Sequence, residues 1–213
     1  MRGLLKIVAM SLVFFPGIAL ASLPEALFEP QKNSKSLVLT LAVRPVMSPF
    51  AHVRFCMQHP TQCSRQRVSL RKPKVALTQQ RLAELEGINR SVNASIVAQP
   101  DPGGPFNDRW TLFPKAGDCD DYAVSKRARL LELGWPSSSL LLAQLSHTAE
   151  ESHLVLVVRT SGGSFVLDNL ANSIRPLKTV AHRIEKIQSA TAPELWLRPV
   201  NPQPEPRVTL LSF

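Results

Sequence analysis

The sequence has few aromatic residues and no clustering of its positive charges. Phe, Trp and Tyr make up 6% of the 213 residues, and the Lys and Arg residues are scattered along the chain. A nucleic-acid-binding module combines a basic patch with a recognisable motif. Neither is present, so no nucleic-acid partner is expected. The formal net charge of +9 still favours acidic partners or anionic surfaces.

Long apolar runs are lacking beyond the first residues. Residues 1–21 place Arg2 and Lys6 ahead of an apolar run from Ile7 to Leu20, with a cleavage site of small residues ending at Ala21. This run is shorter than the ~20 residues that span a bilayer. We therefore expect a signal peptide, a periplasmic or secreted protein, and no membrane span after cleavage. Its removal takes away two bases and no acids, which lowers the formal net charge from +9 to +7.

Cysteine is scarce as well, with three in the chain. An oxidising compartment allows Cys56 and Cys63 to close a short loop as a disulfide. A metal site at this pair is the weaker interpretation, because His52 and His59 do not complete a familiar zinc spacing. The pairing leaves Cys119 as a lone thiol in an exported protein, and this calls for an explanation.

The length and the hydrophobic content of 44% indicate one folded domain with a real core. Residues 22–50 are rich in proline and predict a loose leader with one short strand at 36–43. Residues 51–213 form the predicted domain. It begins with a short helix at 51–58, a basic connector at 65–74 and a helix that Thr78 caps and that ends before Pro100.

The pattern after residue 115 is typical of an α+β domain. A helix starts at Cys119 and runs through Leu133 to a stop at Gly134, and strands are predicted at 140–145, 154–160 and 165–170. One helix followed by antiparallel strands gives the α+β class. Two sets of residues divide the helix, and the apolar set is expected to be buried and the basic set exposed. These are Val124, Ala128 and Leu131 for the apolar set and Lys126, Arg127 and Arg129 for the basic set.

Cys119 stands at the predicted first turn of this helix. The unpaired amides and the positive dipole end of a helix N-terminus stabilise a thiolate there. Downstream, His153 leads a strand and Asp168 ends the next strand, an order typical of thiol nucleophilic catalysis. His147 is a rival base, although no strand holds it. The structural alternatives are a small buried cysteine, a structural histidine and a turn-forming aspartate.

The simplest register of the two strands separates the presumed base from its partner. A two-residue turn at Gly162 and Gly163 pairs Asp168 with Val157, roughly 13 Å along the strand from His153. That is too far for a hydrogen bond. A bulge, an earlier turn or a different strand arrangement is therefore required if the two residues act together.

Other side chains near the nucleophile suggest an oxyanion donor and a metal site. The Cys119 amide and the indole of Trp110 are candidate oxyanion donors, although Trp110 is also interpretable as an aromatic anchor of the core. Asp118, Asp120 and Asp121 fit helix capping, but three acids so close repel one another and raise the pKa of Cys119. A hard cation such as calcium would relieve this repulsion.

A set of motifs carries a family resemblance. These are Gly117-Asp118-Cys119-Asp120-Asp121-Tyr122-Ala123, His153 at the head of a strand, Val166-Leu167-Asp168-Asn169-Leu170 before Ile174-Arg175-Pro176, and the 55–63 segment with Cys56 and Cys63. On these motifs, over about residues 50 to 200, the chain resembles the bacterial transglutaminase-like cysteine peptidases. That family includes the LapG-type periplasmic proteases.

The resemblance implies a fold, a site and partners. The fold is a papain or transglutaminase-like core, with the nucleophile at the N-terminus of a central helix packed on an antiparallel sheet, and an N-terminal helical lobe. The triad falls on Cys119, His153 and Asp168, and calcium falls on the acids at 118, 120 and 121. A protein substrate is implied, with a surface adhesin and a regulatory inner-membrane receptor as the partners of the LapG-type members.

The leading hypothesis is a periplasmic cysteine endopeptidase that works through a thioester. A second hypothesis keeps the triad but lets an amine accept the acyl group, as in a transglutaminase or amidase. The third is a binding module without catalysis on the same fold.

Overall fold

The structure is a computed structural model in which residues 43–64, 74–102, 107–146, 152–181 and 183–200 are described. The predicted signal peptide, most of the strand expected at 36–43, most of the basic connector expected at 65–74 and His147 lie outside these ranges. Within them, no helix combines the length and the apolar character that crossing a membrane requires.

The helices follow the predicted order. Thr78 caps the second helix, and its Oγ1 accepts a hydrogen bond from the amide of Arg81 at 3.1 Å. The third helix begins at the predicted cysteine, and Gly134 follows it with a φ of 78°, a conformation that favours glycine. The α-helices are α1 (Phe50–Gln58), α2 (Gln79–Ser95) and α3 (Cys119–Glu132), and the 3₁₀ turns are η3 (Pro60–Cys63), η4 (Ser137–Ser139) and η5 (Leu177–Thr179).

Seven strands form one antiparallel sheet in the order β1-β9-β8-β4-β5-β6-β7, which confirms the predicted α+β class. A separate parallel pair joins β2 to β3 just before α3. The strands are β1 (Val43–Val46), β2 (Val97–Ala98), β3 (Ala116–Gly117), β4 (Leu140–Ser146), β5 (Ser152–Thr160), β6 (Gly163–Asp168), β7 (Ala171–Pro176), β8 (Ile184–Gln188) and β9 (Trp196–Pro199).

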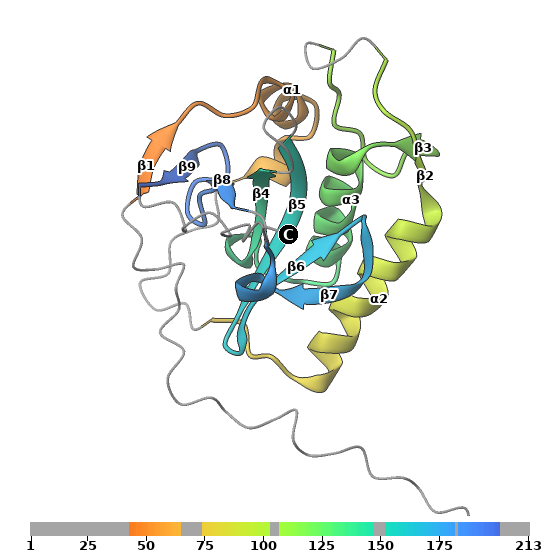
Figure 1. Ribbon diagram of the computed structural model, residues 1–213, viewed down its shortest axis with the longest axis vertical. Helices are drawn as coiled ribbons and strands as arrows, with labels where there is room; N and C mark the ends of the chain where they lie inside the picture. Colours follow the sequence, from red (N-terminus) through yellow and green to blue (C-terminus); the bar gives the residue numbers. More distant parts are fainter. Residues whose placement is uncertain (1–42, 65–73, 103–106, 147–151, 182, 201–213) are drawn as a thin grey trace, which may run out of the picture. The chain divides into compact units, whose positions relative to one another are not determined.

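Helix α3 lies between the sheet and α2 (Figure 1). Leu154, Leu156 and Val158 of β5 share a core cluster with Ala123 and Val124 of α3. On the other side of the helix, Tyr122 packs against Val92 and Ile96. Helix α2 therefore packs as a scaffold against the nucleophile helix.

This central position makes the prediction for the basic face of α3 wrong in two places. Lys126 and Arg127 are buried, with 0% and 2% of their surface exposed. Arg127 donates to the carbonyl oxygens of Leu140 and Gln62, at 3.2 and 2.6 Å. The amphipathic pattern failed because other elements cover α3 on more than one face, and Arg129 alone of the three is exposed.

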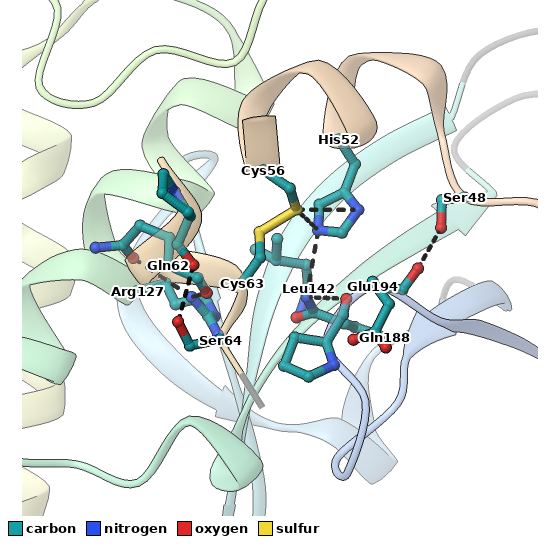
Figure 2. Close-up of a disulfide and its surroundings, with 12 residues drawn as sticks. Ser48, His52, Cys56, Gln62, Cys63, Ser64, Arg127, Leu142, Gln188 and Glu194 are labelled. Atoms are coloured by element: carbon teal, nitrogen blue, oxygen red, sulfur yellow. Dashed lines mark hydrogen bonds between the residues drawn. A yellow bond between two sulfur atoms is a disulfide. The ribbon is translucent and has the colours of Figure 1, made fainter. Parts of the chain in front are cut away.

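Helix α1 is joined to η3 by a disulfide and packs on the sheet through an aromatic cluster. Cys56 and Cys63 form the disulfide, with their Cα atoms 5.5 Å apart, and it links α1 to η3 (Figure 2). His52 points from α1 toward the sheet, where its Nδ1 accepts a hydrogen bond from the Trp196 indole at 3.2 Å. Burial lowers the pKa of His52 to about 4.

Part of the predicted leader contributes to the domain. Residues 43–46 form β1, which pairs antiparallel with β9, so that Val46 faces Trp196. Val46 also packs against the main core cluster. The edge of the sheet is thus built from residues that precede the expected start of the domain at residue 51.

Candidate active site

Cys119 is the first residue of α3, and the segment before it is tightly fixed. Asp118 and Asp121 form a reciprocal capping box, in which the amide of Asp118 donates to Oδ2 of Asp121 at 3.2 Å. A Cβ on Gly117 would lie 2.0 Å from that same oxygen, so only glycine fits there. The capping box therefore sets the direction in which the Cys119 side chain leaves the helix.

The Cys119 sulfur lies against the start of β5. Its Sγ accepts a hydrogen bond from the amide of Leu154, the residue after His153, at 3.4 Å. The pairing of β5 with β6 begins at Leu156, so Leu154 lies beyond that part of the ladder. The thiol and the histidine thus meet the same end of the same strand.

His153 and Asp168 are hydrogen bonded, with 2.8 Å between Nε2 and Oδ1. The register explains how. Thr160 pairs with Gly163 and Leu156 with Leu167, so the turn is at Ser161 and Gly162, one residue earlier than the simple prediction. The predicted pairing of Asp168 with Val157 is wrong, because Val157 pairs with Val166. The earlier turn carries Asp168 toward His153.

Asp168 is 4% exposed and is held from several sides. Its Oδ1 also accepts from the amide of Leu170 at 3.0 Å, and its Oδ2 accepts from Nη2 of Arg175 at 2.8 Å. Burial alone would raise its pKa, but the His153 hydrogen bond, the Leu170 amide and the Arg175 charge lower it to about 2. The carboxylate is therefore ionised and oriented toward the imidazole.

The surroundings of Cys119 disfavour the thiolate when no cation is bound. Burial raises the pKa of Cys119 to about 12, and the carboxylates of Asp120, Asp118 and Asp108 act in the same direction, while the Leu154 amide opposes them. The repulsion expected from the sequence is thus present. Because of this repulsion, either Cys119 stays a neutral thiol or a positive charge near the acids stabilises its thiolate.

Asp108 belongs to this acidic cluster, although the sequence interpretation did not include it. Asp108, Asp118 and Asp120 each keep one buried carboxylate oxygen without a hydrogen-bond partner among the described residues. Burial raises the pKa of Asp120, and the nearby Asp108 and Asp118 raise it further. Ligand atoms of Asp118, Cys119 and Asp120 lie within 4.8 Å of one another.

Asp121 has the capping role that the alternative interpretation gave it, and its part in a metal site stays a prediction. Its Oδ1 accepts from the amide of Thr111 at 2.6 Å, while its Oδ2 serves the capping box. It therefore ties the preceding loop to α3. Asp108, Asp118 and Asp120 are the set that fits a hard cation, since unpartnered buried carboxylate oxygens are the ligands that calcium takes in flexible geometry.

Trp110 lies in the aromatic core, as the alternative interpretation has it, while its indole Nε1 has no hydrogen-bond partner among the described residues, so the oxyanion role stays a prediction. The Trp110 side chain is 5% exposed, and its ring centroid lies 5.4 Å from His52, 6.2 Å from Phe55 and 6.4 Å from Trp196. This packing fixes the loop that carries Asp108 two residues earlier. Trp110 thereby supports the acidic cluster through the backbone.

Two positioning residues were also missed. Arg175 was noted in the sequence but given no role, and Asn93 of α2 donates from Nδ2 to the backbone oxygen of Asp168 at 3.0 Å. Neither side chain has a spacing that points to Asp168, because both reach it through the packing of β7 and α2. Asp108 offered the weakest signal, as one of two acids in a long loop.

The model of one protein family matches residues 42–202, and its description is bacterial transglutaminase-like cysteine proteinase. This match covers most of the chain. The chain belongs to this family. It is therefore a transglutaminase-like cysteine peptidase, which confirms the predicted family and the predicted enzyme class.

Solved structures of LapG from Legionella pneumophila are also similar to this peptidase. The calcium-bound form is 24% identical with a TM-score of 0.45, over 54% of this chain and 67% of that chain. A second LapG structure and an EGTA-treated form are each 26% identical with a TM-score of 0.44, over 54% of this chain and 67% or 65% of theirs. No curated protein sequence matches the chain.

Proposed function

We propose that this peptidase is an exported endopeptidase that cleaves a protein substrate through a thioester on Cys119, with His153 and Asp168 completing the triad. One observation carries the proposal. His153 and Asp168 form a buried hydrogen bond at the end of β5, and the amide of the next residue, Leu154, donates to the Cys119 sulfur. A structural histidine has no need of an ionised carboxylate that three further groups hold in place.

The proposed reaction assigns one task to each side chain. Asp168 occupies Nε2 of His153, so Nδ1 is the nitrogen that would exchange a proton with Cys119. The thiolate attacks the scissile carbonyl carbon, and the protonated imidazole gives its proton to the departing amine. Water, deprotonated by His153, then attacks the thioester and releases the acid and the thiol. The Cys119 amide at the helix start is placed to donate to the oxyanion.

Calcium is the proposed cofactor, held by Asp108, Asp118 and Asp120. Their unpartnered buried oxygens support this set. A LapG structure from Legionella pneumophila is described as calcium-bound. When bound, the ion would supply positive charge that offsets the repulsion among the carboxylates. The residues of the chain would still orient the imidazole and the thiol.

The predicted signal peptide makes the periplasm or the exterior the proposed compartment. The resemblance to LapG-type proteases makes a surface adhesin the first substrate to test and an inner-membrane receptor the first regulator. Both belong to the proposal.

The test is cleavage of a proteome-derived peptide library by the mature protein with calcium, read by mass spectrometry. Cys119→Ala and His153→Ala should abolish cleavage while circular dichroism stays unchanged. His59→Ala, at a half-buried histidine outside the site, is the matched control and should cleave like the wild type. Cleavage by Cys119→Ala would contradict the proposal.

Adding a primary amine to the same reaction separates hydrolysis from acyl transfer. The proposed peptidase yields free carboxyl ends even when the amine is present. Products that carry the amine at the cut carboxyl, or at glutamine side chains, would assign the triad to acyl transfer instead.

A further inference from the structure

Three basic side chains lie in one row across three neighbouring strands. Arg44 of β1 pairs directly with Arg198 of β9. The β8–β9 register, in which Ile187 faces Leu197, brings Lys186 next to Arg198. Like charges that face each other across strands destabilise a sheet. The arrangement is therefore unfavourable for folding by itself and suggests a ligand of opposite charge.

The row is accessible, and Glu185, beside Lys186, offsets only part of its positive charge. Arg44 and Arg198 are exposed, and Lys186 is half-buried. Among the described residues, none of the three forms an ion pair. Arg44 and Arg198 also line a surface hollow of about 490 Å³, together with Arg183 and one acid, Glu185.

The same row leads to the nucleophile. Lys186 pairs with Gln144 of β4, and Gln144 pairs with Leu154 of β5. The Leu154 amide donates to the Cys119 sulfur. Residues aligned across a sheet project from the same face, and Leu154 packs in the core cluster that contains α3 residues. The basic row therefore extends along the face of the sheet that carries the thiol.

The spacing of the strands converts the distance between the Cys119 sulfur and the basic row into a number of substrate residues. Neighbouring strands are about 4.8 Å apart. Lys186 lies two strands from β5 and Arg44 four strands, and the Cys119 sulfur is a further 3.4 Å away. The row thus covers distances of about 13 to about 23 Å from the sulfur. An extended peptide rises about 3.3 Å per residue, so these distances correspond to about four to seven residues.

We propose that the row of Arg44, Arg198 and Lys186 binds acidic side chains of the substrate, about four to seven residues from the scissile bond on one side. The inference rests on the proposed function and adds a substrate class to it. A single file of charges that begins about 13 Å from the Cys119 sulfur and leads away from it fits an extended peptide better than a membrane surface, which contacts a broad patch.

The test is the frequency of Asp and Glu around each cut in a proteome-derived peptide library. Wild-type enzyme should show acids enriched four to seven residues from the cut on one side, and the Arg44→Gln/Arg198→Gln double variant should lose this enrichment. Two synthetic peptides follow, the best-cut sequence and its Asn/Gln counterpart. Wild type should favour the acidic peptide by about tenfold in kcat/KM, consistent with a few exposed charge pairs.

The controls separate this inference from the peptidase activity itself. The double variant should cut the neutral peptide as fast as wild type, and its melting temperature should rise because facing like charges are removed. Arg44→Lys/Arg198→Lys should keep the preference, and so should Arg90→Gln on α2. Equal cutting of both peptides by wild type would overturn the inference and leave the peptidase intact.

Two other results would also overturn the inference. Binding to phosphatidylglycerol vesicles that depends on Arg44 and Arg198, without any preference for acidic peptides, would assign the row to a membrane surface. If the wild-type enzyme leaves the library uncut, as the Cys119→Ala variant should, both the proposed function and this inference are overturned.

Discussion

Asp168 is the residue at which three parts of the chain meet. It accepts from His153 of β5, from Arg175 of β7 and, through its backbone oxygen, from Asn93 of α2. Its side chain is 4% exposed, while that of Arg175 is 41% exposed. Arg175 therefore holds one carboxylate oxygen from the solvent side and leaves the other for the imidazole.

We predict that Arg175→Gln lowers kcat/KM by about tenfold, since a charged hydrogen bond contributes about 1.5–3 kcal/mol. The Arg175 charge is one of the groups that lower the pKa of Asp168, so without the guanidinium this pKa rises, and both the acid side and the optimum of the pH–rate profile should move to higher pH. Arg175→Lys should restore part of the rate. Arg90→Gln, on the exposed face of α2, is the control, and an unchanged rate and optimum in Arg175→Gln would contradict a positioning role.

At the scale of elements, the site depends on how α3 begins. Gly117 ends β3, and its lack of a side chain leaves room for the Asp121 carboxylate that caps the helix. The same carboxylate ties the preceding loop to α3 through Thr111. The start of the helix and the loop that carries Asp108 are therefore fixed by one side chain, through two hydrogen bonds.

We predict that Gly117→Ala destabilises the fold by about 1–3 kcal/mol, the usual cost of overpacking, and that it lowers activity more than stability requires. Gly87→Ala is the matched control, because a Cβ there meets nothing within 4 Å in α2. It should stabilise the protein by about 0.5–1 kcal/mol. Urea unfolding measures the stability of both variants. A Gly117→Ala variant as stable as the wild type would contradict the role given to the capping box.

The attachment of α1 to the sheet gives a pH-dependent stability. His52 is 1% exposed, and burial lowers its pKa from 6.5 to about 4. Between these values the unfolded chain binds a proton that the folded chain does not, so stability falls as the pH decreases from about 6.5 to 4. A proton on Nδ1 would also oppose the Trp196 indole donor.

We predict a loss of about 3 kcal/mol of unfolding free energy over this range from His52 alone, at about 1.4 kcal/mol per pKa unit. His52→Gln should flatten the curve, and His59→Gln should leave it as it is. Urea unfolding followed from pH 7 to pH 4 makes the measurement. A curve equally steep in wild type and His52→Gln would contradict this role.

At the scale of the whole molecule, the acidic cluster joins the loop before α3 to the helix itself. Three carboxylates, each with one buried oxygen, hold these segments together only when their repulsion is offset. We predict that calcium raises the melting temperature and that a chelator reverses this, with about 2.7 kcal/mol gained when calcium is 100 times its Kd.

The variants Asp108→Asn and Asp120→Asn should lose most of this calcium effect. Glu132→Gln, at an exposed acid at the end of α3, should keep it. A melting temperature that millimolar calcium leaves unchanged in wild type would contradict the metal site and leave the acids as capping residues.

The sequence allowed prediction of those features that depend on local patterns. The capped start of α3, the order of helices and strands and the positions of Cys119, His153 and Asp168 follow from spacing and residue type. The turn at Ser161 and Gly162 could not be predicted, because adjacent glycines allow more than one two-residue turn. The burial of Lys126 and the placement of Asp108 and Arg175 depend on packing between distant segments, which periodicity does not encode.

The most direct test of the central claim is the rate at which iodoacetamide alkylates Cys119 at neutral pH in the presence of calcium, followed by mass spectrometry of the folded protein. Cys56 and Cys63 form a disulfide, so the alkylation measured is that of the free thiol of Cys119. The account predicts rapid alkylation in wild type and a rate at least about tenfold lower in His153→Ala, with His59→Ala unchanged. An inert wild-type thiol, or equal rates with and without His153, would contradict it.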